Sequence, residues 1–340
     1  MTATATTPGS SRHGDEPLLS VRDLRVTFTR QGEDPFTAVD GVSFDVRPGQ
    51  TVGLVGESGC GKSVTSLAIM GLLPARGNRV EGTATFEGTD LLTLAKDKMR
   101  DRRGRDIAMI FQDPLSSLNP VVPIGRQVTE VLERHKSMSR KAATPVAREL
   151  LDRVGIPDPD RRLTDYPHQL SGGMRQRALI AMALACEPRL LIADEPTTAL
   201  DVTIQAQILG LLKELVTESG TALVMITHDL GVVAGLCDEV NVLYGGRIVE
   251  RGRRHELFAS PRHPYTTGLL ASIPRLDGAR GAPLTPIPGS VADNLPWEHA
   301  CAFAPRCSQP VDRCTEQSPE LEHDDGGRAL RCFNPVEATS

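Results

Sequence analysis

The chain has 340 residues, of which 39% are hydrophobic and 24% charged, a balance typical of a folded globular protein rather than a disordered one. Its net charge of −5 leaves no basic surplus for nucleic-acid phosphates, and aromatic residues, at 4%, are too few for a base-stacking surface. Nucleic acid is therefore excluded as a partner, and at roughly 150 residues per domain the length predicts two domains.

Membrane-spanning and secreted classes are also disfavoured. A membrane helix needs roughly 18 to 20 uninterrupted apolar residues, and the best run here, residues 178–186, ends at Glu187. Residues 1–16 are small and polar without the apolar segment of a signal peptide, so they are predicted to be a disordered tail. We expect a cytoplasmic protein whose cysteines stay reduced.

The pattern of apolar residues changes along the chain. Residues 18–56 alternate apolar and polar side chains, which predicts short strands, and from Gly61 the spacing becomes helical. The charged run at 96–105 predicts a solvated helix face, and residues 124–154 predict further helices.

Two apolar runs, residues 190–193 and 222–226, alternate with helical segments. Strands that alternate with helices predict an α/β fold with a parallel sheet. Prolines recur after about residue 258, so we predict one domain over 17–258 and a small proline- and cysteine-rich C-terminal extension over 259–340.

A glycine-rich loop follows a predicted strand at residues 50–56. The segment Gly56-Glu-Ser-Gly-Cys-Gly-Lys-Ser63 fits the phosphate-loop pattern G-x-x-x-x-G-K-[ST], and a helix begins directly after it. Backbone N–H groups of such a loop, together with the helix N-terminus, surround phosphate oxygens. Lys62 then reaches the β- and γ-phosphates, and the Ser63 hydroxyl ligates Mg²⁺. The predicted nucleotide contacts in this loop are Gly56, Ser58, Gly59, Cys60, Gly61, Lys62, Ser63 and Val64, with Cys60 as a small structural side chain rather than a redox centre.

Two acidic residues follow the apolar run at 190–193. Because ligands of open α/β sheets bind at the carboxyl edge, we expect Asp194 to hold Mg²⁺ and Glu195 to polarise the attacking water. Two acids at a strand end are a weak signal alone. Together with the phosphate loop they indicate hydrolysis of a nucleoside triphosphate.

A second helix start with anion-binding character lies 23 residues before Asp194, in Leu170-Ser-Gly-Gly-Met-Arg-Gln176. Ser171 is a favourable N-cap, and Ser-Gly-Gly at a helix start offers N–H groups to phosphate. Two phosphate sites in one chain favour a head-to-tail dimer with each nucleotide between two chains. The predicted nucleotide contacts here are Ser171, Gly172, Gly173 and Gln176.

At this point the sequence resembles the ATP-binding-cassette (ABC) ATPases over about residues 18–258. The resemblance implies a phosphate-loop NTPase fold with a RecA-like core, an antiparallel β subdomain and a helical subdomain at about 115–168. Phe111-Gln-Asp-Pro114 is similar to the family's Q-loop, which implies that Gln112 touches Mg²⁺ and the attacking water.

Further site residues follow from the same resemblance. Ala199-Leu-Asp201 is similar to the D-loop, which implies that Asp201 lies at the dimer interface. Ile226-Thr-His-Asp229 is similar to the switch region, which implies that His228 senses the γ-phosphate. An aromatic residue of the first strands stacks on adenine in this family, and Phe28 is the candidate, with Phe36 as the fallback.

Finer resemblance points to the dipeptide/oligopeptide importers. The segments Phe111-Gln-Asp-Pro-Leu-Ser-Ser-Leu-Asn-Pro120 and His263-Pro-Tyr-Thr266 are similar to that branch. The stretch after Pro120 and the run Met225-Ile-Thr-His-Asp-Leu-Gly-Val-Val233 are more similar to its D-type than to its F-type subunit. This implies an ATP-hydrolysing translocase subunit for peptide uptake at the cytoplasmic face of the cell membrane. The implied partners are a second homologous ATPase in a heterodimer, two transmembrane permeases and an extracytoplasmic solute-binding protein.

Other functions within the family remain alternatives. Importers of nickel or another small solute are close relatives, although many nickel importers lack a long C-terminal segment. ATPases of DNA repair carry long coiled coils between the two phosphate motifs, whereas 108 residues without heptads separate Lys62 from Ser171. ATPases of translation carry two cassettes, and this chain has one.

Four of the seven cysteines crowd into the extension as Cys301-x₅-Cys307-x₆-Cys314-x₁₇-Cys332. This spacing fits no common zinc or ferredoxin pattern and leaves open free thiols, zinc and iron–sulfur. Some peptide-importer ATPases hold a [4Fe–4S] cluster in a similar extension, so the resemblance predicts such a cluster with a structural role, and zinc as the alternative. Cys186 and Cys237 are predicted to be buried apolar thiols.

Overall fold

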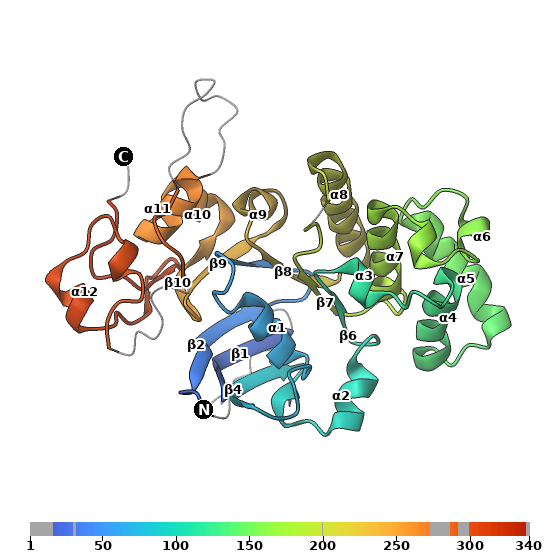
Figure 1. Cartoon of the computed structure of the whole chain (residues 1–340), viewed down its shortest axis with the longest axis horizontal. Helices are drawn as coiled ribbons and strands as arrows, with labels where there is room; N and C mark the ends of the chain where they lie inside the picture. The colour runs from blue at the N-terminus through green and yellow to red at the C-terminus, as the bar shows by residue number, and fades with distance from the viewer. Residues whose placement is uncertain (1–15, 30–31, 199, 273–285, 292–298, 338–340) are drawn as a thin grey trace, which may run out of the picture.

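The computed structural model describes residues 16–29, 32–198, 200–272, 286–291 and 299–337 (Figure 1). Apart from Glu16, the predicted N-terminal tail lies outside these residues. Across the described ranges, no helix is both long and apolar enough to cross a membrane.

A four-stranded antiparallel sheet with strand order β2-β1-β4-β5 forms one layer. It consists of β1 (Leu19–Phe28), β2 (Phe36–Val46), β4 (Asn78–Phe86) and β5 (Thr89–Asp90). Alternation shapes these strands: in β2, Val42, Phe44 and Val46 are buried, and the residues between them point away from the core. The register pairs Phe28 with Phe36, which places the two adenine-stacking candidates side by side.

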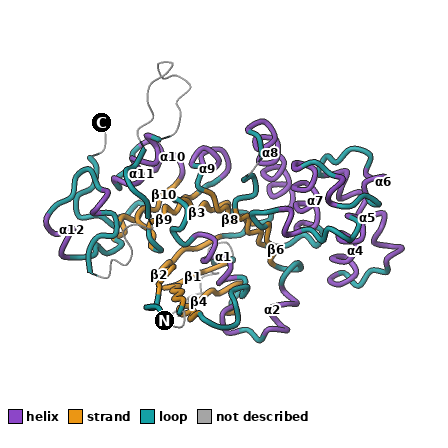
Figure 2. The backbone as a smooth tube through the Cα atoms, in the orientation of Figure 1, coloured by secondary structure: helices purple, strands orange, loops and turns teal. Residues whose placement is uncertain are grey.

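An eight-stranded sheet with strand order β11-β12-β10-β9-β3-β8-β7-β6 forms the frame of the molecule (Figure 2). Its parallel part consists of β3 (Thr51–Val55), β6 (Ile107–Ile110), β7 (Leu190–Asp194), β8 (Ala222–Thr227) and β9 (Glu239–Tyr244). Every residue of β7 and β8 is buried, as expected of parallel strands covered on both faces. The strands β3, β6, β7 and β8 therefore all end at one edge, where the predicted catalytic residues follow them.

The helices that precede β7 fall into two regions (Figure 1). α1 (Lys62–Ile69) and α2 (Lys96–Arg102) lie beside the antiparallel sheet, and α2, which carries the charged run, buries only Met99. A helical lobe stands apart from α1, and the predicted subdomain at about 115–168 falls within it. The lobe contains α3 (Pro114–Ser117), α4 (Ile124–His135), α5 (Arg140–Arg153), α6 (Pro159–Arg162), the 3₁₀ turn η2 (Pro167–Gln169) and α7 (Gly172–Leu184).

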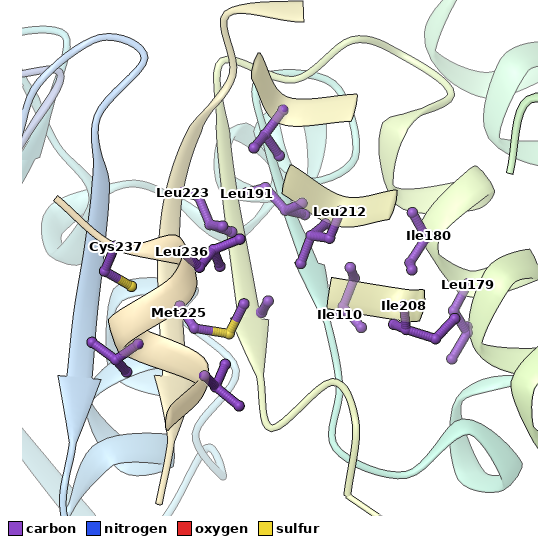
Figure 3. Packing of buried hydrophobic residues seen from close by; sticks show 14 of the residues in the cluster. Ile110, Leu179, Ile180, Leu191, Ile208, Leu212, Leu223, Met225, Leu236 and Cys237 are labelled. Carbon is purple, nitrogen blue, oxygen red and sulfur yellow. The ribbon is translucent and has the colours of Figure 1, made fainter. Parts of the chain in front are cut away.

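The hydrophobic core lies on both faces of the parallel sheet. On one face, α7, α8 (Val202–Ser219) and α9 (Leu230–Leu236) cover the strands, with Leu212 of α8 beside Leu191 and Leu223 (Figure 3). On the other face, the antiparallel sheet and α1 pack against the strands. Replacing one of these leucines with alanine lowers the free energy of unfolding by about 2–5 kcal/mol. This tight packing makes the sheet a rigid base for the loops at its carboxyl edge.

The C-terminal extension is continuous with the sheet. The predicted boundary at 258 falls within α10 (Arg254–Ala259), which follows β10 (Arg247–Arg253). After α11 (Pro264–Ala271), the 3₁₀ turn η4 (Ala304–Arg306) and α12 (Asp312–Glu316), the chain returns as β11 (Glu322–His323) and β12 (Ala329–Leu330). Because β12 pairs antiparallel with β10, the extension adds strands to the sheet that carries the predicted site.

Candidate functional site

The glycine-rich loop connects β3 to α1 and needs glycine at two positions. Gly56 has φ 154°, and a Cβ there would overlap the carbonyl oxygen of Leu243. Gly61, the N-cap of α1, has φ 96°, and a Cβ there would overlap the carbonyl oxygen of Ala38. At these two positions the loop lies against neighbouring backbone with no room for a side chain.

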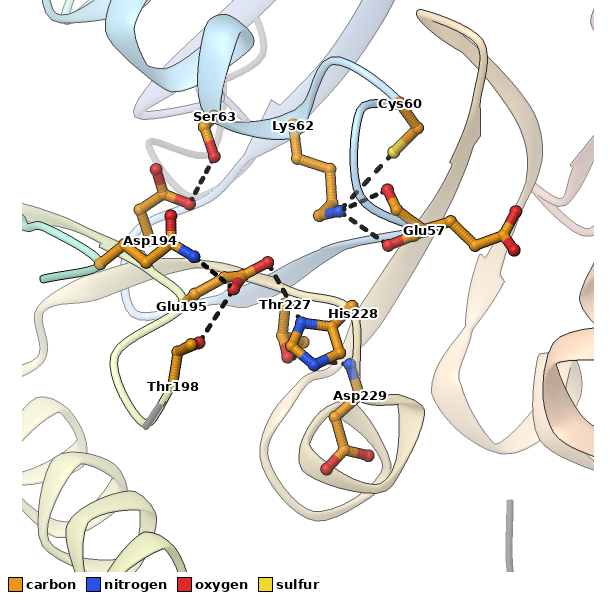
Figure 4. A network of polar contacts seen from close by, with 12 residues as sticks. Glu57, Cys60, Lys62, Ser63, Asp194, Glu195, Thr198, Thr227, His228 and Asp229 are labelled. Atoms are coloured by element: carbon orange, nitrogen blue, oxygen red, sulfur yellow. Dashed lines mark hydrogen bonds and ion pairs between the residues drawn. The ribbon is translucent and has the colours of Figure 1, made fainter. Parts of the chain in front are cut away.

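Lys62 lies inside the curve of this loop (Figure 4). Its Nζ donates to the carbonyl oxygens of Gly56 at 2.7 Å and Glu57 at 2.9 Å, and the side chain is buried. Cys60 is also buried, with its sulfur 3.7 Å from the Lys62 Nζ, and burial raises the pKa of its thiol. A buried protonated thiol suits the predicted structural role of Cys60.

Ser63 and Asp194 bring oxygen ligands together. Ser63 Oγ donates to Asp194 Oδ1 at 2.9 Å (Figure 4). Burial raises the pKa of Asp194, and the neighbouring Glu195 charge adds to this, while the Ser63 hydrogen bond and Lys62 oppose it. A hydroxyl beside a carboxylate is the kind of oxygen set that Mg²⁺ prefers, so these residues fit the predicted ion.

Glu195 is the centre of a hydrogen-bond network (Figure 4). Its Oε2 accepts from Gln112 Nε2 and from Thr198 Oγ1, each at 2.9 Å, and its Oε1 lies 3.2 Å from His228 Nδ1. Burial by itself would raise the pKa of Glu195, but the hydrogen bonds from His228 and Thr198 outweigh it and hold this pKa below its ordinary value. The structure thus brings the three predicted catalytic residues, Glu195, Gln112 and His228, into one network around an ionised carboxylate.

Two features of Glu195 were not anticipated from the sequence. Its φ of 47° is in the left-handed region, which is unusual for a residue with a side chain and typical of a functional site. Thr198, three residues later, orients the carboxylate, and its only sequence signal is that short spacing.

A cavity of ≈ 890 Å³ opens over the phosphate loop, within the size range of small-molecule sites. Most of the predicted nucleotide and catalytic residues line it: Phe28, Ser58, Gly59, Gly61, Lys62, Ser63, Val64, Gln112, Glu195 and His228. Phe36, the fallback adenine-stacking residue, also lines it and is 42% exposed, whereas Phe28 is half-buried. Gly56, Cys60 and Asp194 are buried and do not line the cavity.

Part of the cavity wall was missed by the sequence reasoning. Leu269 of α11, together with Ser290 and Val291, lines the cavity from the C-terminal extension. No motif in the sequence marks these three residues, because their placement depends on how the extension packs against the phosphate loop.

The second phosphate motif lies away from this cavity. Ser171 caps α7 by accepting from the Met174 N–H at 3.3 Å, and Asp201 caps α8 by accepting from the Ile204 N–H at 3.0 Å. A Cβ on Gly173 would lie 2.9 Å from Ile204 Cγ2, so the two helix starts are closely packed. None of the predicted contacts of this motif lines the cavity, namely Ser171, Gly172, Gly173 and Gln176. Asp201 of the predicted D-loop does not line it either.

Gln176 differs from the others in this group. Its side chain is 1% exposed, so it is packed inside the lobe rather than presented at the start of α7. This burial does not fit the predicted nucleotide contact. The helical period explains it, since Gln176 lies on the face of α7 that covers the core.

The four extension cysteines are neighbours without being bonded to one another. All are free of disulfides, and the Cys301 N–H donates to the Cys314 carbonyl oxygen at 2.8 Å. Burial raises the pKa of Cys332 to about 11; the Asn334 N–H lowers it, and Cys301, Cys307 and Cys314 add a further increase. Among the described residues, no three histidine, cysteine or acidic side chains are grouped as a metal site, so the predicted iron–sulfur cluster has no support from this geometry.

Comparison with known proteins identifies the family. The family described as "ABC transporter" matches residues 39–198, and the one described as "Oligopeptide/dipeptide transporter, C-terminal region" matches residues 249–314. The chain is 51% identical over 334 residues to the oligopeptide transport ATP-binding protein OppD of Escherichia coli (strain K12), covering 98% of each chain. The chain belongs to the ABC transporter family, among the ATP-binding proteins of oligopeptide and dipeptide transport. This ABC protein is also 54% identical over 319 residues to the dipeptide transport ATP-binding protein DppD of Bacillus subtilis (strain 168), covering 94% of this chain and 95% of that one.

Solved structures share the fold of this ABC protein. A dimeric post-hydrolysis state of the ATP-binding cassette MJ0796 bound to ADP and Pi has a TM-score of 0.62 and 29% identity, covering 69% of this chain and 98% of that chain. The structure of cbiO1 from Clostridium perfringens has a TM-score of 0.60 and 28% identity, covering 72% of this chain and 92% of that chain. The predicted ABC cassette fold is confirmed.

Proposed function

We propose that this ABC protein is the ATP-hydrolysing subunit of a peptide importer. The observation that carries the proposal is the convergence of Lys62, Ser63, Gln112, Glu195 and His228 on one cavity. The names of the relatives, which are oligopeptide and dipeptide transport ATP-binding proteins, supply the substrate class. A subunit of this kind works with permeases that span the membrane.

The residues of the cavity have separate roles in ATP hydrolysis. Lys62 and the loop N–H groups bind the β- and γ-phosphates of ATP. Ser63 and Asp194 would hold Mg²⁺, which when bound neutralises charge on the phosphate oxygens. Glu195 accepts the proton of the water that attacks the γ-phosphorus, and the bond from that phosphorus to the bridging oxygen breaks, so that ADP leaves. Gln112 and Thr198 hold the Glu195 carboxylate in place.

A second ATPase subunit would complete the site. The Ser171 helix start and Asp201 are exposed and do not line the cavity of their own chain, which favours their use on a nucleotide bound by a partner. The similar cassette MJ0796 is described as dimeric with ADP and Pi bound. By the resemblance of the sequence to D-type subunits, the partner is a homologous but different ATPase.

The remaining partners are two transmembrane permeases and an extracytoplasmic solute-binding protein, which place this chain at the cytoplasmic face of the membrane. In the segment that follows β6 and contains Gln112, the apolar side chains of Phe111, Leu115 and Val121 are 39%, 61% and 77% exposed. Exposed apolar residues next to a catalytic glutamine suit contact with a permease helix.

The four extension cysteines are proposed to hold a [4Fe–4S] cluster, with Zn²⁺ as the alternative. Burial raises the pKa of Cys301, Cys307 and Cys332, and nearby backbone N–H groups partly offset this; the Gln309 N–H donates to the Cys307 sulfur at 3.5 Å. Such N–H groups favour thiolates, the form that binds either metal. A cluster would give the core-poor extension something to fold around.

Metal analysis tests this part of the proposal. The full chain purified without oxygen should contain iron and acid-labile sulfide, and the double variant Cys307→Ser/Cys314→Ser should lose both. The matched control Cys186→Ser, outside the extension, should keep them. A colourless protein with one zinc supports the alternative, and a metal-free protein contradicts both.

Transport by the assembled complex tests the function itself. Vesicles containing the four membrane-associated subunits and the solute-binding protein should take up labelled dipeptides or oligopeptides only with ATP. Glu195→Gln in this chain should abolish that uptake. ATP-driven uptake of Ni²⁺ without uptake of peptides would contradict the peptide assignment and favour the nickel alternative.

A further inference from the structure

The phosphate loop is tied to the C-terminal extension by a bidentate ion pair. Arg306 Nη1 donates to Glu57 Oε2 at 2.6 Å, and Arg306 Nη2 donates to Glu57 Oε1 at 2.9 Å. The Arg306 side chain is only 2% exposed, although 249 residues separate the two partners in the chain. Nothing in the activity described so far uses this pair.

The same guanidinium holds the cavity wall. Its Nε donates to the Pro288 carbonyl oxygen at 2.6 Å, and its Nη2 donates to the Gly289 carbonyl oxygen at 3.0 Å. Ser290 and Val291 follow directly and line the cavity. Arg306 therefore joins the phosphate loop to the part of the wall that the extension contributes.

Glu57 is held by its backbone as well as by its side chain. Its N–H donates to the Tyr265 hydroxyl of α11 at 2.8 Å. Phe303 packs edge-on to Tyr244 at 5.1 Å and tilted against Tyr265 at 5.4 Å between ring centroids, which fixes the turn that carries Arg306. All of these side chains except Glu57 are buried, so the link is part of the packed structure.

The charge of Glu57 gives this link a function. A carboxylate within a loop that binds a polyphosphate repels the ligand unless a positive group offsets it. The Glu57 carboxylate points away from Lys62 (Figure 4), and both of its oxygens are taken by Arg306. Arg306 thus leaves the positive charge of Lys62 available for the phosphates.

We propose that Arg306 is a positioning residue for ATP: it neutralises Glu57, sets the phosphate loop and holds the Ser290–Val291 wall. The C-terminal extension then completes the nucleotide site of its own chain. This inference rests on the proposed ATPase function.

The first test separates binding from chemistry in the assembled transporter. Arg306→Ala should raise the KM for ATP about tenfold, the loss expected when charge-assisted hydrogen bonds are removed. The kcat should stay within about twofold, because the loop holds the phosphates alike in the ground and transition states. Arg306→Lys, which keeps the charge but not the bidentate geometry, should fall between wild type and Arg306→Ala.

The second test asks whether the uncompensated charge of Glu57 causes the loss of ATP affinity in Arg306→Ala. Adding Glu57→Gln to Arg306→Ala removes the uncompensated carboxylate and should recover most of the lost ATP affinity, to within about threefold of wild type. A residue that only stabilises the fold would show no such recovery. Arg313→Ala is the matched control, because Arg313 also precedes a cysteine but is exposed and stacks on Phe333 at 4.0 Å.

The outcomes are distinct. Unchanged KM in Arg306→Ala, or a double variant no better than Arg306→Ala, would overturn the proposal. A wild-type chain that neither binds nor hydrolyses ATP would overturn the proposed function instead. Thermal unfolding of each full-length variant, with fluorescent ATP binding measured on the folded fraction, separates a folding defect from lost affinity.

Discussion

Ser63 and Asp194 are 131 residues apart in the chain, yet Ser63 Oγ donates a 2.9 Å hydrogen bond to Asp194 Oδ1. The contact exists because β3 and β7 flank β8 in parallel, so that the start of α1 and the end of β7 meet at one edge of the sheet. It joins the phosphate loop to the acidic pair, and each of these parts yields a separate prediction.

Asp194→Asn should stabilise the ligand-free chain at neutral pH. Burial raises the pKa of Asp194 in the folded chain above its ordinary value of 3.8. At a pH between 3.8 and the raised pKa, the folded chain therefore binds more protons than the unfolded chain. Stability therefore falls as the pH rises through that window, and at pH 7 the ionised Asp194 is a cost. We expect the variant to raise Tm by about 2 °C at pH 7 and to lose this gain as the pH approaches 3.8.

The order of the Tm values of wild type and Asp194→Asn should reverse when Mg²⁺ and ATP are bound. Mg²⁺ and ATP together should raise the Tm of wild type more than that of Asp194→Asn, because a ligand stabilises the form that binds it better. Differential scanning calorimetry at several pH values, with and without Mg-ATP, measures both effects. A variant less stable than wild type at pH 7 without ligand would contradict the assigned cost of the Asp194 charge.

Glu195→Gln should keep ATP binding and lower kcat by at least about 100-fold, the scale of general-base catalysis. The amide retains the shape of the side chain but cannot accept the proton of the attacking water. Phosphate release and fluorescent nucleotide binding on the same preparation distinguish the two effects. Normal turnover in this variant would remove the assignment of Glu195 as the base.

Lys62→Ala should weaken ATP binding by about 100-fold, since a buried ammonium aimed into the loop is lost. Lys98→Ala is the matched control, because Lys98 is an exposed lysine of α2 outside the cavity. Equilibrium titration with ATP compares the two. Equal affinities would show that Lys62 does not contact the phosphates.

Substitutions of Phe28 and Phe36 should differ in their effect on binding of the adenine base. Loss of the stacking residue should weaken ATP binding about tenfold and leave the affinity for inorganic tripolyphosphate unchanged, because only ATP carries a base. Phe28→Ala should show this pattern and Phe36→Ala should not. If Phe36→Ala shows it instead, the stacking residue is the more exposed partner of the pair.

Local sequence patterns were sufficient for much of the site. The strand, the glycine-rich loop, Lys62 and Ser63 form one continuous segment, so their geometry is set by neighbours in the chain. The apolar run before Asp194 likewise predicted a buried strand that ends at the acid, and β7 ends there. The burial of Gln176 was not predicted, because a seven-residue motif does not show which face of a helix is buried.

By itself, the sequence determined which residues carry the chemistry: the phosphate loop, the acidic pair and the second helix start are each read from consecutive positions. Only the tertiary structure decided which of them share a cavity, because the order of parallel strands brings together residues as distant as Gln112 and Glu195. It also decided that the extension belongs to the site. The pairing of Arg306 with Glu57 spans 249 residues and depends on the packing of Phe303, Tyr244 and Tyr265, which no short motif encodes.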